Sequence, residues 1–217
     1  MSVIFEGNKL LWEVSNSIGF IHLADPPENR MNHVFFKELG QLIYETIPES
    51  NVDAIIVTGT GRHFSSGAEL EDLFDVVKEK KTDRLMENYA ILKKLNSLQL
   101  PVIAAIRGVC LGAAFELALH CHFRLCAEDA IMGLPESSFG IIPGLDGISK
   151  MLALAGKAKT IELVLSGQHF NASDALKWHL ADRVFPKKVL LNKAIDLAKI
   201  CAVKYRKYSK EDYLKKL

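Results

Sequence analysis

Two segments of the chain repeat one pattern, in which a short apolar run is followed by a turn of small residues and the start of a helix. The first run is AIIVTG at residues 54–59, and the second is VIAAI at residues 102–106. Runs that are apolar at every position, instead of at every second position, are typical of strands buried on both faces. Because such strands belong to parallel sheets covered by helices, the repeat predicts an α/β fold.

The other elements are predicted from hydrophobic periodicity. Two short strands are expected within residues 3–23, followed by a loop over residues 24–30, because adjacent prolines exclude both a sheet ladder and a helix interior. Pro48 is expected to end the first helix, and Asn171 or Ser173 to cap a helix before a last short strand. Apolar residues at helical spacing predict helices over residues 34–47, 83–98, 148–155, 158–165 and 190–205.

Length and charge limit the class of protein. The 217 residues are 49% hydrophobic, enough for a full core, and the net charge of +1 argues against nucleic acid as the main partner. No apolar run reaches membrane-spanning length, and the four cysteines have no spacing typical of a disulfide framework. We therefore expect a cytoplasmic chain with reduced thiols, no membrane partner, a core domain over residues 1–195 and a short helical tail over residues 196–217.

Two glutamates lie in apolar, glycine-rich surroundings. Glu116 lies within GAAFELAL, and Glu136 lies between GLP and SSFGIIPG. Burial disfavours the charged form of a carboxyl group, so a carboxylate on an apolar helix is usually solvated or paired. Two such residues, each beside glycines that let a backbone approach a ligand closely, favour a pair of functional carboxyls instead. From the residues alone, both interpretations stay open.

The turn after the first buried strand is a second candidate. Residues 65–68 (SSGA) precede the acidic Glu69, Glu71 and Asp72 at a predicted strand-to-helix turn. Small residues there expose backbone N–H groups, and the N-terminus of a helix favours an anionic oxygen. A capped helix with no ligand explains the same pattern. The loop lacks both G-x-G-x-x-G and a following Lys-Ser/Thr pair, so it is only weakly indicative of a nucleotide site.

A His-Cys-His triplet at residues 120–122 raises the question of a metal site. Its spacing, with Cys126 nearby, does not match the usual zinc patterns, and consecutive residues do not easily converge on one ion. We expect these side chains to be structural, and no metal site is predicted.

Four segments resemble the crotonase superfamily, the enoyl-CoA hydratase and isomerase group. HFSSGAEL is similar to one oxyanion loop of that family, and PVIAAIRGVCLGAAFELALHC to the segment with the other oxyanion donor and the first catalytic glutamate. GLPESSFGIIPGLDG is similar to the segment with the second glutamate, and VLSGQHFNASDALKWHLADRVFP to the closing stretch. The resemblance covers most of residues 1–195. It implies a spiral of repeated β-β-α units, with two roughly perpendicular sheets flanked by helices.

The resemblance also implies a site and a reaction. It places the two oxyanion backbone donors at Ser66 and Ala113, and the catalytic carboxyls at Glu116 and Glu136. The implied reaction is addition of water to a 2-enoyl thioester, by a lyase of fatty acid metabolism. The alternatives are double-bond isomerisation, thioester hydrolysis or decarboxylation, and thioester binding or scaffolding without turnover. Further substrate-binding positions are implied at Ser65, Gly67, Ala68, Gly112, Pro135, Gly144 and Leu145.

The implied ligand is a thioester of coenzyme A or of the phosphopantetheine arm of an acyl carrier protein, with no separate cofactor. Arg30, Arg62 and the lysines among residues 78–81 could meet its phosphates, although surface solvation explains them equally well. A homo-oligomer, most simply a trimer, is implied. The chain stops, however, before the helical region that usually supports trimer contacts and closes the acyl pocket.

The loop after Glu136 departs from the family pattern. The family usually has a small residue and a glycine where this chain has Leu145 and Asp146. Leu145 is expected to narrow the acyl site. Asp146 is expected to cap the next helix, with a third carboxylate in the pocket as the alternative. Ala113 occupies the position of a family glycine, and its backbone N–H remains able to donate.

Overall fold

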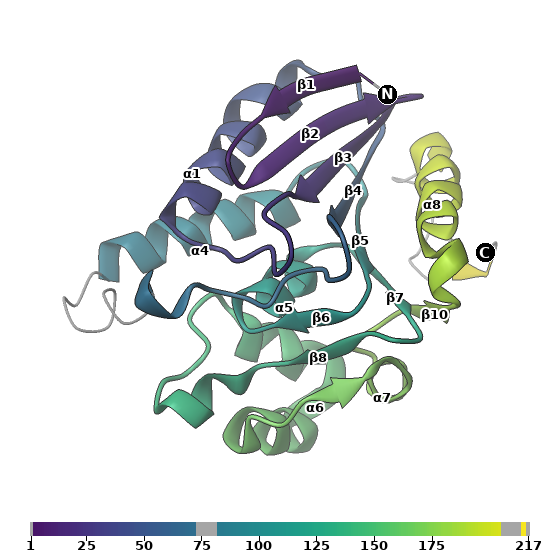
Figure 1. Ribbon diagram of the computed structural model, residues 1–217. Coiled ribbons are helices and arrows are strands. Elements are labelled where there is room, and N and C mark those ends of the chain that lie inside the picture. The colour runs from purple at the N-terminus through teal and green to yellow at the C-terminus, as the bar shows by residue number, and fades with distance from the viewer. Residues whose placement is uncertain (1, 73–81, 205–213, 216–217) are drawn as a thin grey trace.

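The structure, a computed structural model, describes residues 2–72, 82–204 and 214–215, and contains two sheets (Figure 1). The first three strands of the larger sheet form antiparallel pairs, and its other strands are parallel. In spatial order, the larger sheet contains β1 (Ser2–Glu6), β2 (Leu10–Ser15), β3 (Ile18–Leu23), β4 (Ala54–Gly59), β5 (Val102–Ile106), β7 (Phe123–Ala127) and β10 (Arg183–Phe185).

The smaller sheet contains β6 (Val109–Leu111), β8 (Ile131–Gly133) and β9 (Phe170–Asn171). β6 and β8 are parallel, and β8 and β9 are antiparallel. Figure 1 shows this sheet with α6 (Gly147–Ser166) and α7 (Ala172–Lys177) at the end of the molecule opposite β1. The predicted α/β class is therefore confirmed, with two mixed sheets flanked by helices.

The larger sheet is covered on both faces. One face packs against α1 (His33–Gln41), α4 (Thr82–Asn96) and α5 (Ala113–His120), and the other against α8 (Leu190–Lys204). In Figure 1, α8 lies across the sheet from α1 and α4. This arrangement explains why β4 and β5 are buried at every position.

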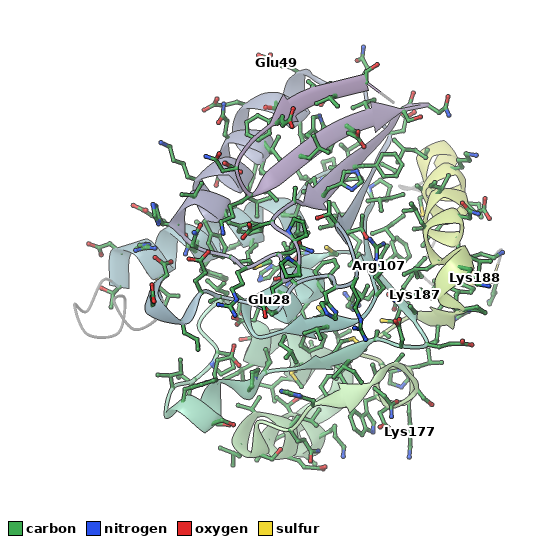
Figure 2. All side chains as sticks on the ribbon, in the orientation of Figure 1. Glu28, Glu49, Arg107, Lys177, Lys187 and Lys188 are labelled. Atoms are coloured by element: carbon green, nitrogen blue, oxygen red, sulfur yellow. The ribbon has the colours of Figure 1, made fainter. Side chains whose placement is uncertain are left out.

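Two polar side chains fix the loop that follows β4. Arg107, labelled in Figure 2, donates from its guanidinium to the carbonyl oxygens of Gly59 (2.6 Å) and Gly61 (3.0 Å). The buried amide of Asn29 donates to three more carbonyl oxygens of this loop, those of Thr60, His63 and Phe64. Because the loop leads directly into residues 65–68, these bonds fix the start of the candidate oxyanion segment.

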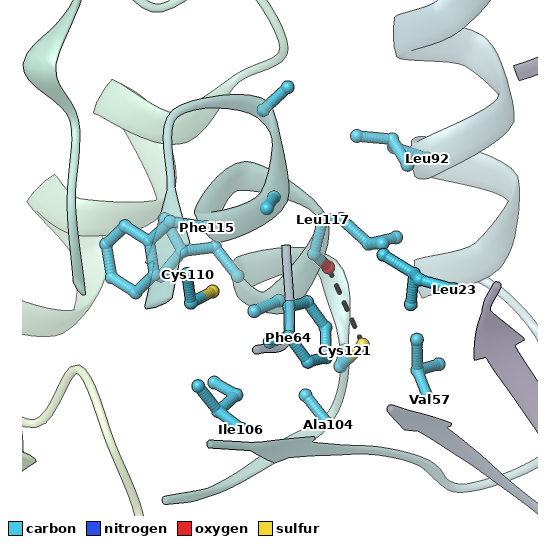
Figure 3. Close-up of a cluster of buried hydrophobic side chains, with 14 of the residues drawn as sticks. Leu23, Val57, Phe64, Leu92, Ala104, Ile106, Cys110, Phe115, Leu117 and Cys121 are labelled. Carbon is cyan, nitrogen blue, oxygen red and sulfur yellow. Dashed lines mark hydrogen bonds between the residues drawn. The ribbon is translucent and has the colours of Figure 1, made fainter. Parts of the chain in front are cut away.

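The two faces of the sheet belong to separate apolar clusters. Ile55 of β4 belongs to the cluster that contains α5, whereas its neighbour Ile56 belongs to the cluster that contains α8. Figure 3 shows part of the first cluster, where Phe115 and Leu117 of α5 lie near side chains of β4 and β5. Alternate burial of this kind confirms that β4 is buried on both faces. The packing of the first cluster also anchors α5, the helix that carries Glu116.

The predicted strand list was incomplete. Residues 2–23 contain three strands instead of two, because β1 pairs only along one edge of the sheet and is mostly exposed, which leaves little apolar pattern in its sequence. β6 and β8 have three residues each, too few for a periodicity to be visible. β7 follows α5 within a continuous apolar stretch, in which the boundary between helix and strand is hidden.

The sequence predicted that the first helix ends at Pro48, but the helical structure continues slightly beyond the proline. α1 continues through a π-helical turn (Leu42–Thr46) into α2 (Ile47–Glu49), and the helical structure ends one residue after the proline. In the π-helical turn the Ile47 N–H bonds to the Leu42 carbonyl, one residue further back than in an α-helix. With this shifted hydrogen-bond spacing, Pro48, which lacks an N–H, follows within the last turn of the helix.

Other boundary predictions are confirmed. Gly156 interrupts α6 with a positive φ of 76°, which separates the two predicted helices. Asn171 caps α7, and its side chain accepts from the Asp174 N–H at 2.9 Å. Residue 195, where the core was expected to end, lies inside α8, and this helix packs onto the sheet on both sides of that position. The lysines at 78–81 and residues 205–213 of the tail lie outside the described residues. None of the described helices is long and apolar enough to cross a membrane.

Candidate active site

A cavity of about 400 Å³ collects the predicted site residues. Its wall is formed by residues before α1, the loop after β4, α4, the start of α5 and the segment from Pro135 to Leu145. All predicted site residues except Ser65 line it, namely Ser66, Gly67, Ala68, Gly112, Ala113, Glu116, Pro135, Glu136, Gly144 and Leu145. The residues that the family resemblance implied therefore lie around one cavity.

Glu116 projects from the first turn of α5, a helix in which every residue is buried. The side chain is only 2% exposed, and its Oε1 accepts hydrogen bonds from the Leu145 N–H (2.8 Å) and the Gly147 N–H (2.9 Å). A Cβ on Gly147 would lie 2.8 Å from the Cγ and Oε1 atoms of Glu116. Glycine at 147 is thus required for the close approach between the carboxyl and the backbone.

Asp146 does not have the role predicted for it. It lies at the N-cap position of α6 in a left-handed conformation (φ 72°), but its side chain makes no capping hydrogen bond. The Glu116 carboxylate instead binds the first N–H of α6, that of Gly147. Asp146 is also not among the residues that line the cavity, so the alternative of a third carboxylate in the pocket is not supported.

Glu136 lies in a 3₁₀ helix (Pro135–Phe139) that also contributes to the lining of the cavity. Its Oε1 is near Gly112, where an added Cβ would approach it to 3.0 Å. Its Oε2 is buried and has no hydrogen-bond partner among the described residues. A buried acceptor without a partner is costly, which is typical of a site that awaits a ligand or water.

Both carboxyl groups have raised pKa values. Burial raises the pKa of Glu116 to about 7, and the negative charge of Glu136 adds to this effect, while the N–H groups of Gly147 and Leu145 oppose it. Burial also raises the pKa of Glu136 to about 7. Near neutral pH, one carboxyl can therefore hold a proton while the other is charged, as a general acid and a general base require.

The backbone donors differ from the sequence prediction at one position. The Ser66 N–H donates to the Glu28 carbonyl oxygen (2.9 Å), so it is not free to bind a ligand; Glu28 is labelled in Figure 2. Ala68 forms a parallel bridge with Met31. In this bridge the Met31 N–H donates to the Gly67 carbonyl, and the Glu69 N–H donates to the Met31 carbonyl. Within the described ranges, the Ala68 N–H itself has no acceptor. The free donor in this loop is therefore Ala68, two residues after the predicted one.

Ala113 offers the second N–H. It is the first residue of α5, where N–H groups have no acceptor within the helix. The loop at Gly67 packs directly against it, because a Cβ on Gly67 would lie 3.7 Å from the Ala113 nitrogen and 2.5 Å from the Leu111 oxygen. The loop that carries Ala68 is thus packed beside the start of α5, and both Ala68 and Ala113 line the cavity.

Ser65 is a supporting residue and not a lining residue. It is fully buried, and its Oγ accepts from the Gly67 N–H at 3.0 Å. Its backbone pairs with β6, donating to the Val109 carbonyl oxygen and accepting from the Leu111 N–H. The predicted contact between Ser65 and substrate is therefore replaced by a role in shaping the loop.

The cavity is also lined by residues that were not among the predicted catalytic and substrate-binding positions. Arg30, proposed from sequence as a phosphate contact, lines the cavity, whereas Arg62 does not. Asn88 on α4 is a polar lining residue that sequence reasoning missed, and its position one turn after Leu85 on the cavity-facing side of α4 was the available signal. Additional residues that line the cavity are Met31, Phe36, Leu70, Phe139, Ile141, Ile142 and His169. No cluster of three or more metal-binding side chains occurs in the described part of the chain.

Comparisons with known proteins bear on the family and the fold. The family model for enoyl-CoA hydratase/isomerase matches residues 13–211. A Bacillus subtilis protein named "Probable enoyl-CoA hydratase" is 34% identical over 170 residues, which are 78% of this chain and 66% of that protein. A solved enoyl-CoA hydratase structure from Geobacillus kaustophilus has a TM-score of 0.87 at 24% identity, covering 93% of this chain and 77% of that one. A Thermobifida fusca structure in complex with CoA has a TM-score of 0.80 at 23% identity, covering 95% and 89%.

The two structural matches show the fold, and the family match extends over nearly the whole sequence. The chain spans just under two thirds of the length of its Bacillus relative. With the match of the family model over residues 13–211, the chain belongs to the enoyl-CoA hydratase/isomerase family.

Proposed function

We propose that this protein adds water across the double bond of a 2-enoyl thioester. The observation that carries the proposal is the pair of buried carboxyls, Glu116 and Glu136, which face one cavity and both have a pKa of about 7. The cavity also holds the N–H groups of Ala68 and Ala113, a pair of donors for one oxygen. An acid, a base and two oxyanion donors are the groups that this reaction needs.

The thioester carbonyl oxygen accepts hydrogen bonds from Ala68 and Ala113. When a water oxygen bonds to the β-carbon, the electrons of the double bond move towards this carbonyl and give it enolate character. Two preorganised donors stabilise that charge, each typically by about 3 kcal/mol. The two alanines have small side chains, which let the thioester approach the backbone closely.

The carboxyls divide the proton transfers. The Glu116 carboxylate takes a proton from the attacking water, and the protonated Glu136 delivers a proton to the α-carbon. The product is the 3-hydroxyacyl thioester. Glu116 is then protonated and Glu136 charged, and a proton passes back between them through water to complete the cycle. The unpartnered Oε2 of Glu136 supports its role as the group that contacts substrate.

Double-bond isomerisation is the nearest alternative, because a single carboxyl can shuttle the proton. The second carboxyl favours hydration over isomerisation, and over hydrolysis, decarboxylation or binding without turnover. Arg30 on the cavity wall, and the CoA bound by the Thermobifida relative, favour coenzyme A as the carrier. We further propose a homo-oligomer, most simply a trimer, as the assembled form.

A spectrophotometric assay with crotonyl-CoA tests the proposal. We expect loss of the conjugated enoyl-thioester absorbance, with 3-hydroxybutyryl-CoA as the product. A 3-enoyl-CoA serves as the second substrate, and a gain of the same absorbance would identify isomerisation. Folded protein that binds acyl-CoA but changes neither substrate would contradict the proposal.

A further inference from the structure

His120 is a buried, titratable side chain that the proposed chemistry does not use. It lies one turn after Glu116 on α5, and its ring is 1% exposed. Its Nε2 lies 3.0 Å from the carbonyl oxygen of Leu145. Because a carbonyl oxygen can only accept, Nε2 carries the proton in this contact. The other ring nitrogen, Nδ1, is buried and has no partner in the part of the chain that the structure describes.

The Leu145 residue is therefore held from both sides by one helix. Its N–H donates to Glu116 Oε1 at 2.8 Å, and its carbonyl accepts from His120 at 3.0 Å. Glu116 and His120 are four residues apart on α5, so their side chains project from the same face of the helix. Loss of the His120 contact would free the Leu145 backbone to turn, and its N–H would leave the carboxylate.

We propose that His120 is a positioning residue for the proposed base, acting through the backbone of Leu145. By fixing Leu145, it keeps an N–H on Glu116 Oε1, and this leaves Glu116 Oε2 to face the water that is to be deprotonated. Among the described residues, Glu116 Oε2 has no hydrogen-bond partner, and Glu116 lines the cavity. The role as base rests on the proposed function, whereas the control of the carboxylate by His120 does not.

The surroundings of His120 suit a neutral, fixed donor. The ring packs edge-on against Tyr89 of α4, with 6.3 Å between ring centroids, and the Asn96 amide donates to the His120 carbonyl at 2.9 Å. Burial lowers the pKa of His120, the hydrogen bond to the Leu145 carbonyl raises it, and the charges of Lys150 and Asp146 have opposite effects on it. A neutral imidazole adds no charge beside Glu116, so the glutamate keeps the raised pKa that a base working near neutral pH needs.

Two substitutions separate the hydrogen bond from the ring. His120→Leu removes the donor and keeps an apolar group of similar size, whereas His120→Gln places an amide nitrogen close to the position of Nε2. With crotonyl-CoA, we expect His120→Leu to lower kcat roughly 10-fold to 100-fold with little change in KM, because misplacement of a reacting group affects turnover more than binding. His120→Gln should recover most of that loss. If His120→Leu does not fold, His120→Asn, whose side chain is too short to reach Leu145, replaces it.

His122 provides a matched control. Its imidazole is also hydrogen-bonded, accepting from the Val102 N–H and contacting the Asn96 carbonyl, whereas the His120 ring contacts the Leu145 carbonyl. His122→Leu should lower stability and leave kcat unchanged. An equal loss of kcat in this variant would show that any lost imidazole in this region impairs turnover, and it would overturn the proposal.

A titration that needs no substrate distinguishes this inference from the proposed function. Protein labelled with ¹³C at the glutamate side-chain carboxyls gives the pKa of Glu116 by NMR, with Glu116→Gln identifying the signal. Because N–H donors favour the charged form, the pKa of Glu116 should rise by roughly one unit in His120→Leu and stay unchanged in His120→Gln. No rise in His120→Leu, or an equal rise in both variants, would overturn the inference. A rise in a protein that does not hydrate crotonyl-CoA would remove the proposed function and leave the positioning role intact.

Discussion

Glu116 and Glu136 face the same cavity but belong to differently built regions. Glu116 lies on a fully buried helix, and its Oε1 is held by two backbone N–H groups. Glu136 lies on a short 3₁₀ helix, and its Oε2 has no partner among the described residues. The segment after Glu136 also exposes apolar side chains, with Phe139 46% and Ile142 75% exposed.

The difference indicates which carboxyl suits which proton transfer. Backbone donors fix the orientation of a carboxylate and favour its charged form, which suits a base that must face one water. Burial favours the protonated form of Glu136, and its Oε2 has no partner among the described residues, which suits an acid that delivers a proton to the α-carbon. The two groups have similar pKa values, so it is their hydrogen bonding that separates them.

Replacing each carboxyl by its amide gives the largest expected effect. Glu116→Gln and Glu136→Gln should each lower kcat by roughly 10²-fold or more and leave thioester binding nearly intact. The fold should tolerate both changes, because the amide oxygen introduced by Glu116→Gln can still accept both N–H groups, and Glu136 Oε2 has no partner to lose. Turnover of crotonyl-CoA and acyl-CoA binding measure the two quantities. A Glu136→Gln variant that keeps most of its turnover would leave Glu116 as the only essential carboxyl, as isomerisation requires.

The pH dependence of stability is the next largest effect. Both carboxyls have a pKa near 7 in the folded protein and near 4.5 when exposed, so between these values the folded state binds more protons than the unfolded state. Their contribution to the free energy of unfolding is therefore complete below about pH 4.5 and is lost as pH rises to about 7. We expect each of the two carboxyls to lower stability by about 2.5 kcal/mol between pH 5 and pH 8.

Urea denaturation of the wild type and of the Glu116→Gln/Glu136→Gln double variant measures this contribution. The double variant is needed because burial also lowers the pKa values of His22 and His120, and these groups act with the opposite sign over the same range. The difference between the two proteins should fall as pH rises. A constant difference would mean that neither carboxyl has a raised pKa.

The site residues also show what could be predicted from the sequence and what could not. Glu116, Glu136 and Ala113 were placed by the family resemblance of their segments, and all three line the cavity. The resemblance placed the donor of the other loop at Ser66, but which N–H remains free depends on the Glu28 carbonyl, which approaches from a distant part of the chain. Likewise, the cap expected from Asp146 comes from Glu116 on another helix. The resemblance of short segments therefore indicated the residues around the cavity, whereas the partners of individual N–H groups depended on tertiary contacts.

Gly147→Ala should disturb the Glu116 region specifically. The added Cβ would lie 2.8 Å from Cγ and Oε1 of Glu116 and would displace the carboxyl, so we expect kcat to fall about 10-fold or more. Gly156→Ala on the same helix is the control, since its Cβ would meet nothing within 4 Å and its cost comes from a positive φ of 76°. That variant should lose about 1–3 kcal/mol of stability and keep its turnover. Equal turnover in the two variants would contradict the need for close packing at Glu116.

Ile142→Ser tests the exposed region after Glu136, and its effect should be the smallest. Because the side chain is 75% exposed, the free energy of unfolding should change by no more than about 0.5 kcal/mol. The residue lines the cavity, so loss of its apolar contact with the ligand should raise KM by about threefold and leave kcat unchanged. Leu165→Ser on α6 is matched in exposure (74%) but lies away from the cavity, and it should change neither constant. A fall in kcat for Ile142→Ser alone would mean that this segment orients Glu136, so that the second carboxyl is positioned by its surroundings as closely as the first.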